Sequence, residues 1–296
     1  MSFNSINTNR AAVFAMQSLN QNTMELDASR KRVSTGFRVA DSKDDTGAFS
    51  VAQAVRSDMA GVTAVNEQLG GARGILATTM TSLTQISNTM QQLRTTVTRL
   101  ADGAITAESR TQYNQQFQSL NRQIQSFVAD ATYNGRTLLA TGATTGFPAG
   151  TTGGNIESIR NETGGEFTIQ AFDGASLTLA NSLAATATIA DLGSAAAAQA
   201  YLQTGATATG TTLASIEARI NRALSSFGAS QQFVDNQLTY NTKKLDALND
   251  GLGALVDADL AKESSRMTAL QTRQQLSMQT LSMANQAPQS LLSLFR

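Results

Sequence analysis

The sequence predicts a mainly α protein. We expect a long coiled-coil-like helical bundle built from both chain ends, with a small β-hairpin-containing insertion at its tip. Three observations support this fold class: apolar residues recur at alternating steps of three and four over long stretches, such stretches occur in both halves of the chain, and a middle segment changes to Ala, Gly and Thr. With 296 residues, 41% of them hydrophobic, the chain can bury a substantial core.

The longest apolar repeat runs from Val62 to Leu100. Its positions are Val62, Val65, Leu69, Ala72, Leu76, Thr79, Leu83, Ile86, Met90, Leu93, Val97 and Leu100. Only Thr79 breaks the pattern, and no proline interrupts it. A heptad repeat of this length predicts one helix with a coiled-coil seam, about 60 Å long at 1.5 Å per residue.

Two further stripes predict helices long enough to pack against the first. One extends from Tyr113 to Ala131 and ends before Asn134-Gly135, a pair of residues typical of a turn. The other extends from Leu213 to Leu248. We expect these helices and the first to form an outer helical rod domain, residues 46–140 plus 211–254.

The two chain ends repeat this pattern with fewer apolar residues. The N-terminal stripe is Ala12, Met16, Leu19, Leu26 and Val33, and the C-terminal stripe is Val256, Leu260, Met267, Leu270, Leu281 and Ala284. Two such helices can pair and bring the chain ends together. We expect them to form a discontinuous inner coiled-coil domain, residues 1–45 plus 255–296.

The segment from 141 to 210 is expected to be a short variable insertion. Within "GEFTIQAFDGASLTLA", apolar residues alternate at Phe167 and Ile169, and the pattern resumes at Leu177 after Asp173-Gly174. Asp-Gly between two alternating runs predicts a β-hairpin. The stretch "SAAAAQAYL" predicts a short helix.

Composition excludes several kinds of function. The chain has no His, Cys or Trp, so zinc sites of the usual type and Ser/His or Cys/His nucleophile pairs are excluded. Net charge is zero and no long basic run occurs, which argues against nucleic acid as a partner. No apolar run is long enough for membrane insertion or a conventional leader. The carboxylates Asp257, Asp259 and Glu263 lie on a predicted helix without an accompanying metal motif, so we expect them to be solvated or in ion pairs. We therefore predict that the protein is not an enzyme and uses no cofactor or metal ion.

Charged residues are scarce on long parts of the predicted helices. Gly74–Leu93 has none, Met1–Met24 has only Arg10, and Met267–Arg296 has only Arg273 and Arg296. Uncharged polar side chains can be buried at a lower desolvation cost than ions if they are hydrogen-bonded. The chain ends therefore look suited to being covered by other copies, although an Ala/Thr-rich composition without interface meaning would give the same pattern.

Three sequence blocks together resemble bacterial flagellin, in a short form without large outer domains. They are "RVSTGFRVADSKDDTGA" at Arg32–Ala48, "QFQSLNRQI" followed by "YNGRTLL", and "NQAPQSLLSLFR" at Asn285–Arg296. The resemblance implies a structural subunit of the flagellar filament that assembles noncovalently into a helical tube used for swimming. The alternatives are a hook-filament junction protein, disfavoured by the close terminal match and short insert, and a soluble coiled-coil scaffold, disfavoured by the uncharged ends.

The resemblance also implies partners and a location. The partners would be further copies of the chain, a flagellar export apparatus, an export chaperone, and filament cap and hook junction proteins. The location would be the extracellular filament, reached without a cleaved signal peptide.

The stretch "RKRVSTGFRVADSKDDTG" interrupts the two N-terminal helical patterns and holds eight ionised groups. Gly36 permits a sharp turn, and Asp44 and Asp45 precede a helix, where carboxylates are favourable. The segment fails as a calcium loop because Lys43 stands where Asp or Asn is needed. A solvated linker with a helix cap is one interpretation, and the resemblance favours a subunit contact. The candidate interface residues are Arg30, Arg32, Phe37, Arg38, Asp41, Lys43, Asp44, Asp45, Met16, Leu19, Leu281, Leu292, Leu294 and Phe295.

A block of the flagellin family that a Toll-like immune receptor recognises is altered in this chain. Many flagellins have Gln-Arg-Val-Arg-Glu-Leu-Ala there, with a Glu on the following helix. At the matching places this chain has Gln92, Thr96 and Gln116 instead of Arg, Leu and Glu. Loss of a charge-assisted hydrogen bond and an apolar anchor predicts weak receptor signalling.

Overall fold

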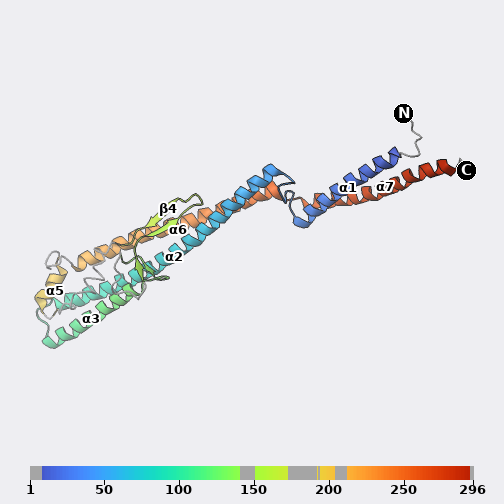
Figure 1. Ribbon diagram of the computed structural model, residues 1–296. Coiled ribbons are helices and arrows are strands. Elements are labelled where there is room, and N and C mark those ends of the chain that lie inside the picture. The colour runs from blue at the N-terminus through green and yellow to red at the C-terminus, as the bar shows by residue number, and fades with distance from the viewer. Residues whose placement is uncertain (1–8, 141–150, 173–191, 193, 204–211, 294–296) are drawn as a thin grey trace. The chain divides into compact units, whose positions relative to one another are not determined.

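The computed structural model describes residues 9–140, 151–172, 192, 194–203 and 212–293 (Figure 1). These residues form six helices and four short strands, which confirms the mainly α fold class. They divide into two compact units, Met1–Met59 with Asp246–Arg296 and Ala60–Leu245, within the described ranges.

The first unit contains the pair of terminal helices that the sequence predicts. Helix α1 (Arg10–Thr35) begins after Asn9, whose side chain accepts a hydrogen bond from the backbone N–H of Ala12, and helix α7 is Leu260–Ser293. The two helices run antiparallel, since Asn9 near the start of α1 donates to the carbonyl of Ala284 late in α7. Figure 1 shows the two helices side by side, so the predicted pairing of the chain ends is confirmed.

The second unit is organised around the long heptad repeat. Helix α2 (Thr46–Leu100) includes the whole repeat, and every one of its twelve positions is buried. Thr79, the one polar member, is accommodated because its hydroxyl donates to the carbonyl of Ile75 at 2.8 Å. The predicted partner helices are also present as α3 (Ala107–Ala129) and α6 (Leu213–Val256).

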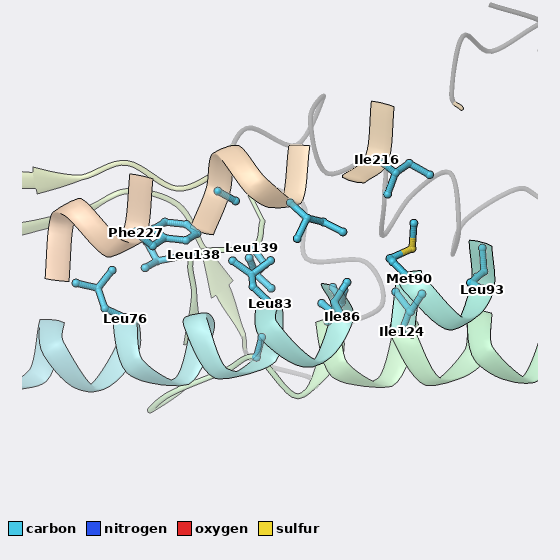
Figure 2. Packing of buried hydrophobic residues seen from close by; sticks show 14 of the residues in the cluster. Leu76, Leu83, Ile86, Met90, Leu93, Ile124, Leu138, Leu139, Ile216 and Phe227 are labelled. Carbon is cyan, nitrogen blue, oxygen red and sulfur yellow. The ribbon is translucent and has the colours of Figure 1, made fainter. Parts of the chain in front are cut away.

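Side chains from α2, α3 and α6 form one continuous core. Figure 2 shows Leu83 of α2 close to Leu138 and Leu139, with Phe227 of α6 beside them. The same cluster includes Ile124 of α3. The apolar stripes therefore face one another, as their periodicity predicts.

The predicted turn at Asn134-Gly135 is confirmed. Asn134 and Gly135 both have positive φ, 49° and 72°. Tyr133 and Arg136 exchange both backbone N–H···O bonds across them, at 2.9 and 3.0 Å. This is the geometry that Asn-Gly favours, because Gly has no Cβ and Asn tolerates the left-handed region.

The middle of the chain has two small sheets. Strand β1 (Arg136–Thr137) pairs in parallel with β2 (Thr152–Gly153). Strands β3 (Ile156–Ile159) and β4 (Glu166–Ile169) form an antiparallel hairpin, with Ile156 opposite Ile169. Gly164, at φ 83°, allows the connection between them to close.

The strand expected around Phe167 and Ile169 is thus confirmed, and its described partner is the preceding strand β3. The predicted turn at Asp173-Gly174 and the residues that follow it lie outside the described residues. The short helix expected from "SAAAAQAYL" is confirmed as α5 (Ala195–Leu202), which begins after a Ser194 side-chain cap.

Candidate assembly surface

The seam between α1 and α7 follows a heptad spacing on both helices. On α1 it includes the buried Ala15, Leu26 and Ser29, and on α7 the buried Leu270. Leu19 and Leu281, both predicted interface residues, are half-buried in this unit. The seam contains few large apolar side chains, so its packing alone supplies a limited hydrophobic contribution.

Polar contacts fill much of the same seam. Asn22 donates to the hydroxyl of Ser277 at 2.9 Å, and Gln274 donates to the hydroxyl of Thr23 at 3.4 Å. These contacts join residues far apart in the chain and are directional, so they favour one alignment of α1 against α7. The uncharged polar residues noted in the sequence are thus used, in part, within the subunit.

Large apolar side chains remain exposed on the outside of this pair. Phe14 has 76% of its surface exposed, and Met16, predicted as an interface residue, has 52%. The other members of this outer apolar surface are Val13, Met24, Leu260, Leu276, Met278 and Met283. Large apolar side chains exposed along both helices of a pair indicate a protein interaction site. Leu292 lies in the last turns of α7, and Leu294 and Phe295 lie outside the described residues.

A sharp turn at Gly36 ends α1. Gly36 has φ 75° and donates its N–H to the carbonyl of Arg32. Its own carbonyl accepts from Ala258, and the backbone N–H of Arg38 donates to the carbonyl of Val256 at 2.7 Å. The Arg38 guanidinium donates to the carbonyl of Leu255 at 2.6 Å. The turn is therefore fixed against the end of α6, and Arg38 contributes to this by backbone and side chain together.

Lys31 organises the acidic part of the turn. Its Nζ lies 2.7 Å from Oδ2 of Asp41 and 3.0 Å from Oδ2 of Asp44. The hydrogen bond from Lys31, helped by the Lys43 N–H, holds the pKa of Asp41 below its usual value. Lys31 and the Ala40 N–H do the same for the pKa of Asp44, and the two carboxylates raise the pKa of Lys31. All three groups are thus held in their charged forms.

Arg32 points the other way, toward α7. Its guanidinium lies 3.1 Å from Oε1 of Glu263, and the Ser29 hydroxyl donates to Oε2 of the same carboxylate at 2.8 Å. Burial works to raise the pKa of Glu263, but the bonds from Ser29 and Arg32 outweigh it and leave the pKa lowered. This Arg32–Glu263–Ser29 cluster joins the two terminal helices by charge-assisted hydrogen bonds.

The remaining predicted charges have local roles. Arg30 pairs with Asp27 at 3.4 Å on the exposed face of α1. Asp45 caps α2 by accepting the Ala48 N–H at 3.0 Å, and Lys43 is exposed. Most of the eight ionised groups therefore have partners inside the subunit. The subunit contact that the resemblance favours would give them partners in neighbouring subunits.

Of the carboxylates Asp257, Asp259 and Glu263, the last two have structural contacts, and Asp257 is exposed. Asp259 caps α7 by accepting the N–H groups of Ala261 and Lys262. The role of Glu263 as the common partner of Arg32 and Ser29 was missed in the sequence. Glu263 lies 231 and 234 residues away from them, and only the antiparallel pairing of the helices joins all three. A heptad alignment of the two terminal stripes would have suggested it.

Phe37 is the apolar residue of this turn that remains accessible. It is 38% exposed, and the Arg56 guanidinium lies 6.0 Å from the centre of its ring. A shallow groove beside it is lined by Asn249, Gly253 and Asp257 among others. An accessible aromatic ring with a cation over its face can contribute to a protein contact.

The three altered receptor positions have different surroundings. Gln92 on α2 and Gln116 on α3 are exposed, whereas Thr96 is buried and donates its hydroxyl to the Gln92 carbonyl. Thr96 therefore contributes to the core of the second unit.

The residues that the structure describes include neither a metal site nor a membrane-spanning helix. Among them, no group of three or more His, Cys, Asp or Glu side chains could hold a metal ion. Across the same ranges, none of the helices combines the length and apolar character needed to cross a membrane.

The geometry of the helix pair and the long core defines a class of protein. A helix pair with a polar, aligned seam and an apolar outer surface, joined to a long helical core, is typical of a subunit that is completed by other subunits. Residues 6–144 match the family model described as the bacterial flagellin N-terminal helical region, and residues 209–295 match the bacterial flagellin C-terminal helical region.

Individual flagellins are similar to the chain to different degrees. The chain is similar to flagellin FljK of Caulobacter vibrioides, with 33% identity over 297 residues that cover 100% of both chains. It is also similar to a flagellin of Brucella melitensis, with 32% identity over 99% of both chains. A crystal structure of Bacillus cereus flagellin is similar with a TM-score of 0.47 and 24% identity, over 59% of this chain and 88% of that one.

The chain belongs to the bacterial flagellin family. It is therefore a structural subunit of the flagellar filament, and none of these matches favours the junction protein.

Proposed function

We propose that the subunit joins its filament through the outer apolar surface of the α1–α7 pair and through the turn that follows α1. The observation that supports this most is the exposure of Phe14 and its apolar neighbours on a helix pair whose seam is already closed. Such side chains gain free energy when another copy covers them. The scarcity of charge near both chain ends lowers the desolvation cost of that burial.

In this proposal the turn sets the shape of the contact. Lys31, Asp41 and Asp44 hold one another, so the turn is preformed and its ordering costs little on assembly. Exposed groups at its edge, Arg38 and Lys43 among them, then meet neighbouring subunits. Phe37 supplies an accessible ring at the same place.

The domain arrangement and the partners extend the same proposal. Residues 1–45 with 255–296 would form the inner domain of the filament, 46–140 with 211–254 the outer rod, and 141–210 the insertion. The protein would leave the cell through a flagellar export apparatus, without a cleaved signal peptide and with the help of an export chaperone. It would contact filament cap and hook junction proteins at the filament ends. It would not be an enzyme and would need no cofactor. The support for these points is the family to which the chain belongs.

A seeded assembly assay tests the proposed surface. Purified subunit is added to short filament seeds under salting-out conditions, and growth is followed by light scattering and negative-stain electron microscopy. Phe14→Ala removes an exposed apolar ring, and Gln17→Ala on the same helix is the matched control because it removes an exposed side chain without an aromatic group. Leu281→Ala and a chain lacking Asn285–Arg296 test the α7 side.

The expected magnitudes follow from apolar burial. If Phe14 is covered in the filament, its loss weakens each subunit contact by about 1 to 2 kcal/mol, which raises the subunit concentration needed for growth by about five- to thirtyfold. Gln17→Ala should grow like the parent. Normal growth of both Phe14→Ala and the shortened chain would contradict the proposed surface, and short rings from the parent would favour the junction protein instead.

A further inference from the structure

Four methionines are concentrated on the terminal helix pair and are open to solvent there. Met16 and Met24 on α1 and Met278 and Met283 on α7 are each between 50% and 70% exposed. In contrast, Met90 in the core of the second unit is 1% exposed. The chain has nine methionines and no cysteine, so thiols do not compete for an oxidant. We propose that these four residues form an oxidation site of the free subunit, and that their sulfoxides block its entry into the filament.

The chemistry requires a two-electron oxidant, which we take to be a peroxide. The thioether sulfur attacks one peroxide oxygen, the O–O bond breaks, and a proton moves to the departing oxygen. One methionine sulfoxide and one water form from one methionine and one hydrogen peroxide. Access to the sulfur sets the order in which methionines react, so the four exposed residues should react before Met90.

Oxidation acts on assembly and leaves the fold in place. These side chains are already in water in the subunit, so a polar sulfoxide at the same position costs the fold little. In the filament contact the same oxygen would have to leave water together with the other exposed apolar side chains of the pair, which is unfavourable without a hydrogen-bond partner. The methionines would be protected once covered, so the sensitive stage is the free subunit. This inference rests on the proposed assembly surface.

The test combines site mapping with growth. The parent subunit is treated with hydrogen peroxide, quenched with catalase and free methionine, and analysed by peptide mass spectrometry for sulfoxide at each methionine. Circular dichroism checks the helices, and seeded growth is then measured. We expect sulfoxide at the four exposed sites while Met90 stays reduced, unchanged helix content, and seeded growth slowed at least tenfold.

Two controls connect the loss of growth to these sites. A variant with Met16→Leu, Met24→Leu, Met278→Leu and Met283→Leu keeps the apolar volume. Its growth after peroxide is compared with its own growth before peroxide, and the two rates should be equal. Because that variant could fail to assemble for other reasons, the oxidised parent is also treated with methionine sulfoxide reductases, which should restore growth. Preassembled filaments treated with the same peroxide should form less methionine sulfoxide at the four sites than the free subunit does.

Several outcomes would overturn the inference. Normal growth of a parent fully oxidised at the four sites would overturn the oxidation inference, but the proposed assembly surface would still stand. An untreated parent that does not grow would contradict the assembly proposal itself. Equal inhibition of the leucine variant by peroxide would place the effect at other methionines.

Discussion

The contact between Glu263 and Arg32 allows a prediction that can be measured residue by residue. Glu263→Gln keeps the size of the side chain and its ability to accept a bond from Ser29, but it removes the charge that faces Arg32. The Glu263 side chain is only 12% exposed and that of Arg32 is 31% exposed, so solvent screens the pair incompletely. A hydrogen bond to a charged group contributes about 1.5 to 3 kcal/mol, and partial exposure of Arg32 lowers the expected loss to about 1 to 2 kcal/mol.

Hydrogen exchange measured by mass spectrometry is the suitable assay, because the protein has two units and a single unfolding curve would mix them. We expect amides in residues 20–35 and 260–275 to exchange about five- to thirtyfold faster in Glu263→Gln, since 1.4 kcal/mol corresponds to about tenfold. Amides around Phe117 should be unchanged. Arg266→Gln is the control, because its contact with Glu25 is long at 4.0 Å and more exposed.

The pH dependence gives an independent check of the same pair. The pKa of Glu263 is lowered from 4.5 in the folded chain. Its contribution to stability is therefore complete above about pH 4.5 and is lost as the pH falls through the lower, folded value. The parent should lose protection of the α1–α7 pair in this range after correction for intrinsic exchange, and Glu263→Gln should lose less. Equal exchange of parent and variant at pH 7, or the same acid loss in both, would refute the assigned role.

Three further predictions concern other parts of the chain. Phe227→Ala removes a ring that is 1% exposed and should destabilise the second unit by about 3 to 5 kcal/mol, as measured by hydrogen exchange of amides in α3. Tyr240→Ala, with 59% exposure, should change it by less than about 0.5 kcal/mol. In Lys31→Met, the pKa values of Asp41 and Asp44 should rise toward 3.8, because the hydrogen bonds from Lys31 are lost. NMR titration measures both values. Purified parent protein should activate receptor-bearing cells weakly; Gln92→Arg with Gln116→Glu should raise the response, and strong activation by the parent would show that the altered block is not limiting.

Much of the fold was predictable because its order is local and periodic. All twelve positions of the repeat from Val62 to Leu100 are buried, and the exposed faces of the same helix are polar. A 3.6-residue period is a property of neighbouring residues, so the sequence contains it directly. The Asn134-Gly135 turn was predictable for a similar reason, since the allowed φ of two residues decides it.

The partners of the charged turn were harder to predict because they depend on pairing across the chain. Arg32 meets Glu263 only when α1 and α7 align antiparallel in one register. The hairpin shows the same difficulty: the alternation at Phe167 and Ile169 predicted a strand, but it contained no information about whether the partner preceded or followed. β3 is the described partner, and Phe167 also stacks on Phe233 of α6 at 4.1 Å between ring centres.

The distribution of polar and apolar residues on the terminal helices separates two tasks. Hydrogen bonds such as Asn22 to Ser277 fix the alignment of α1 and α7, and their net contribution to stability is modest. The large apolar side chains, Phe14 above all, are outside the seam and contribute little until another copy covers them. If another copy covers this surface, as proposed, the stability of the terminal helices depends on subunit concentration.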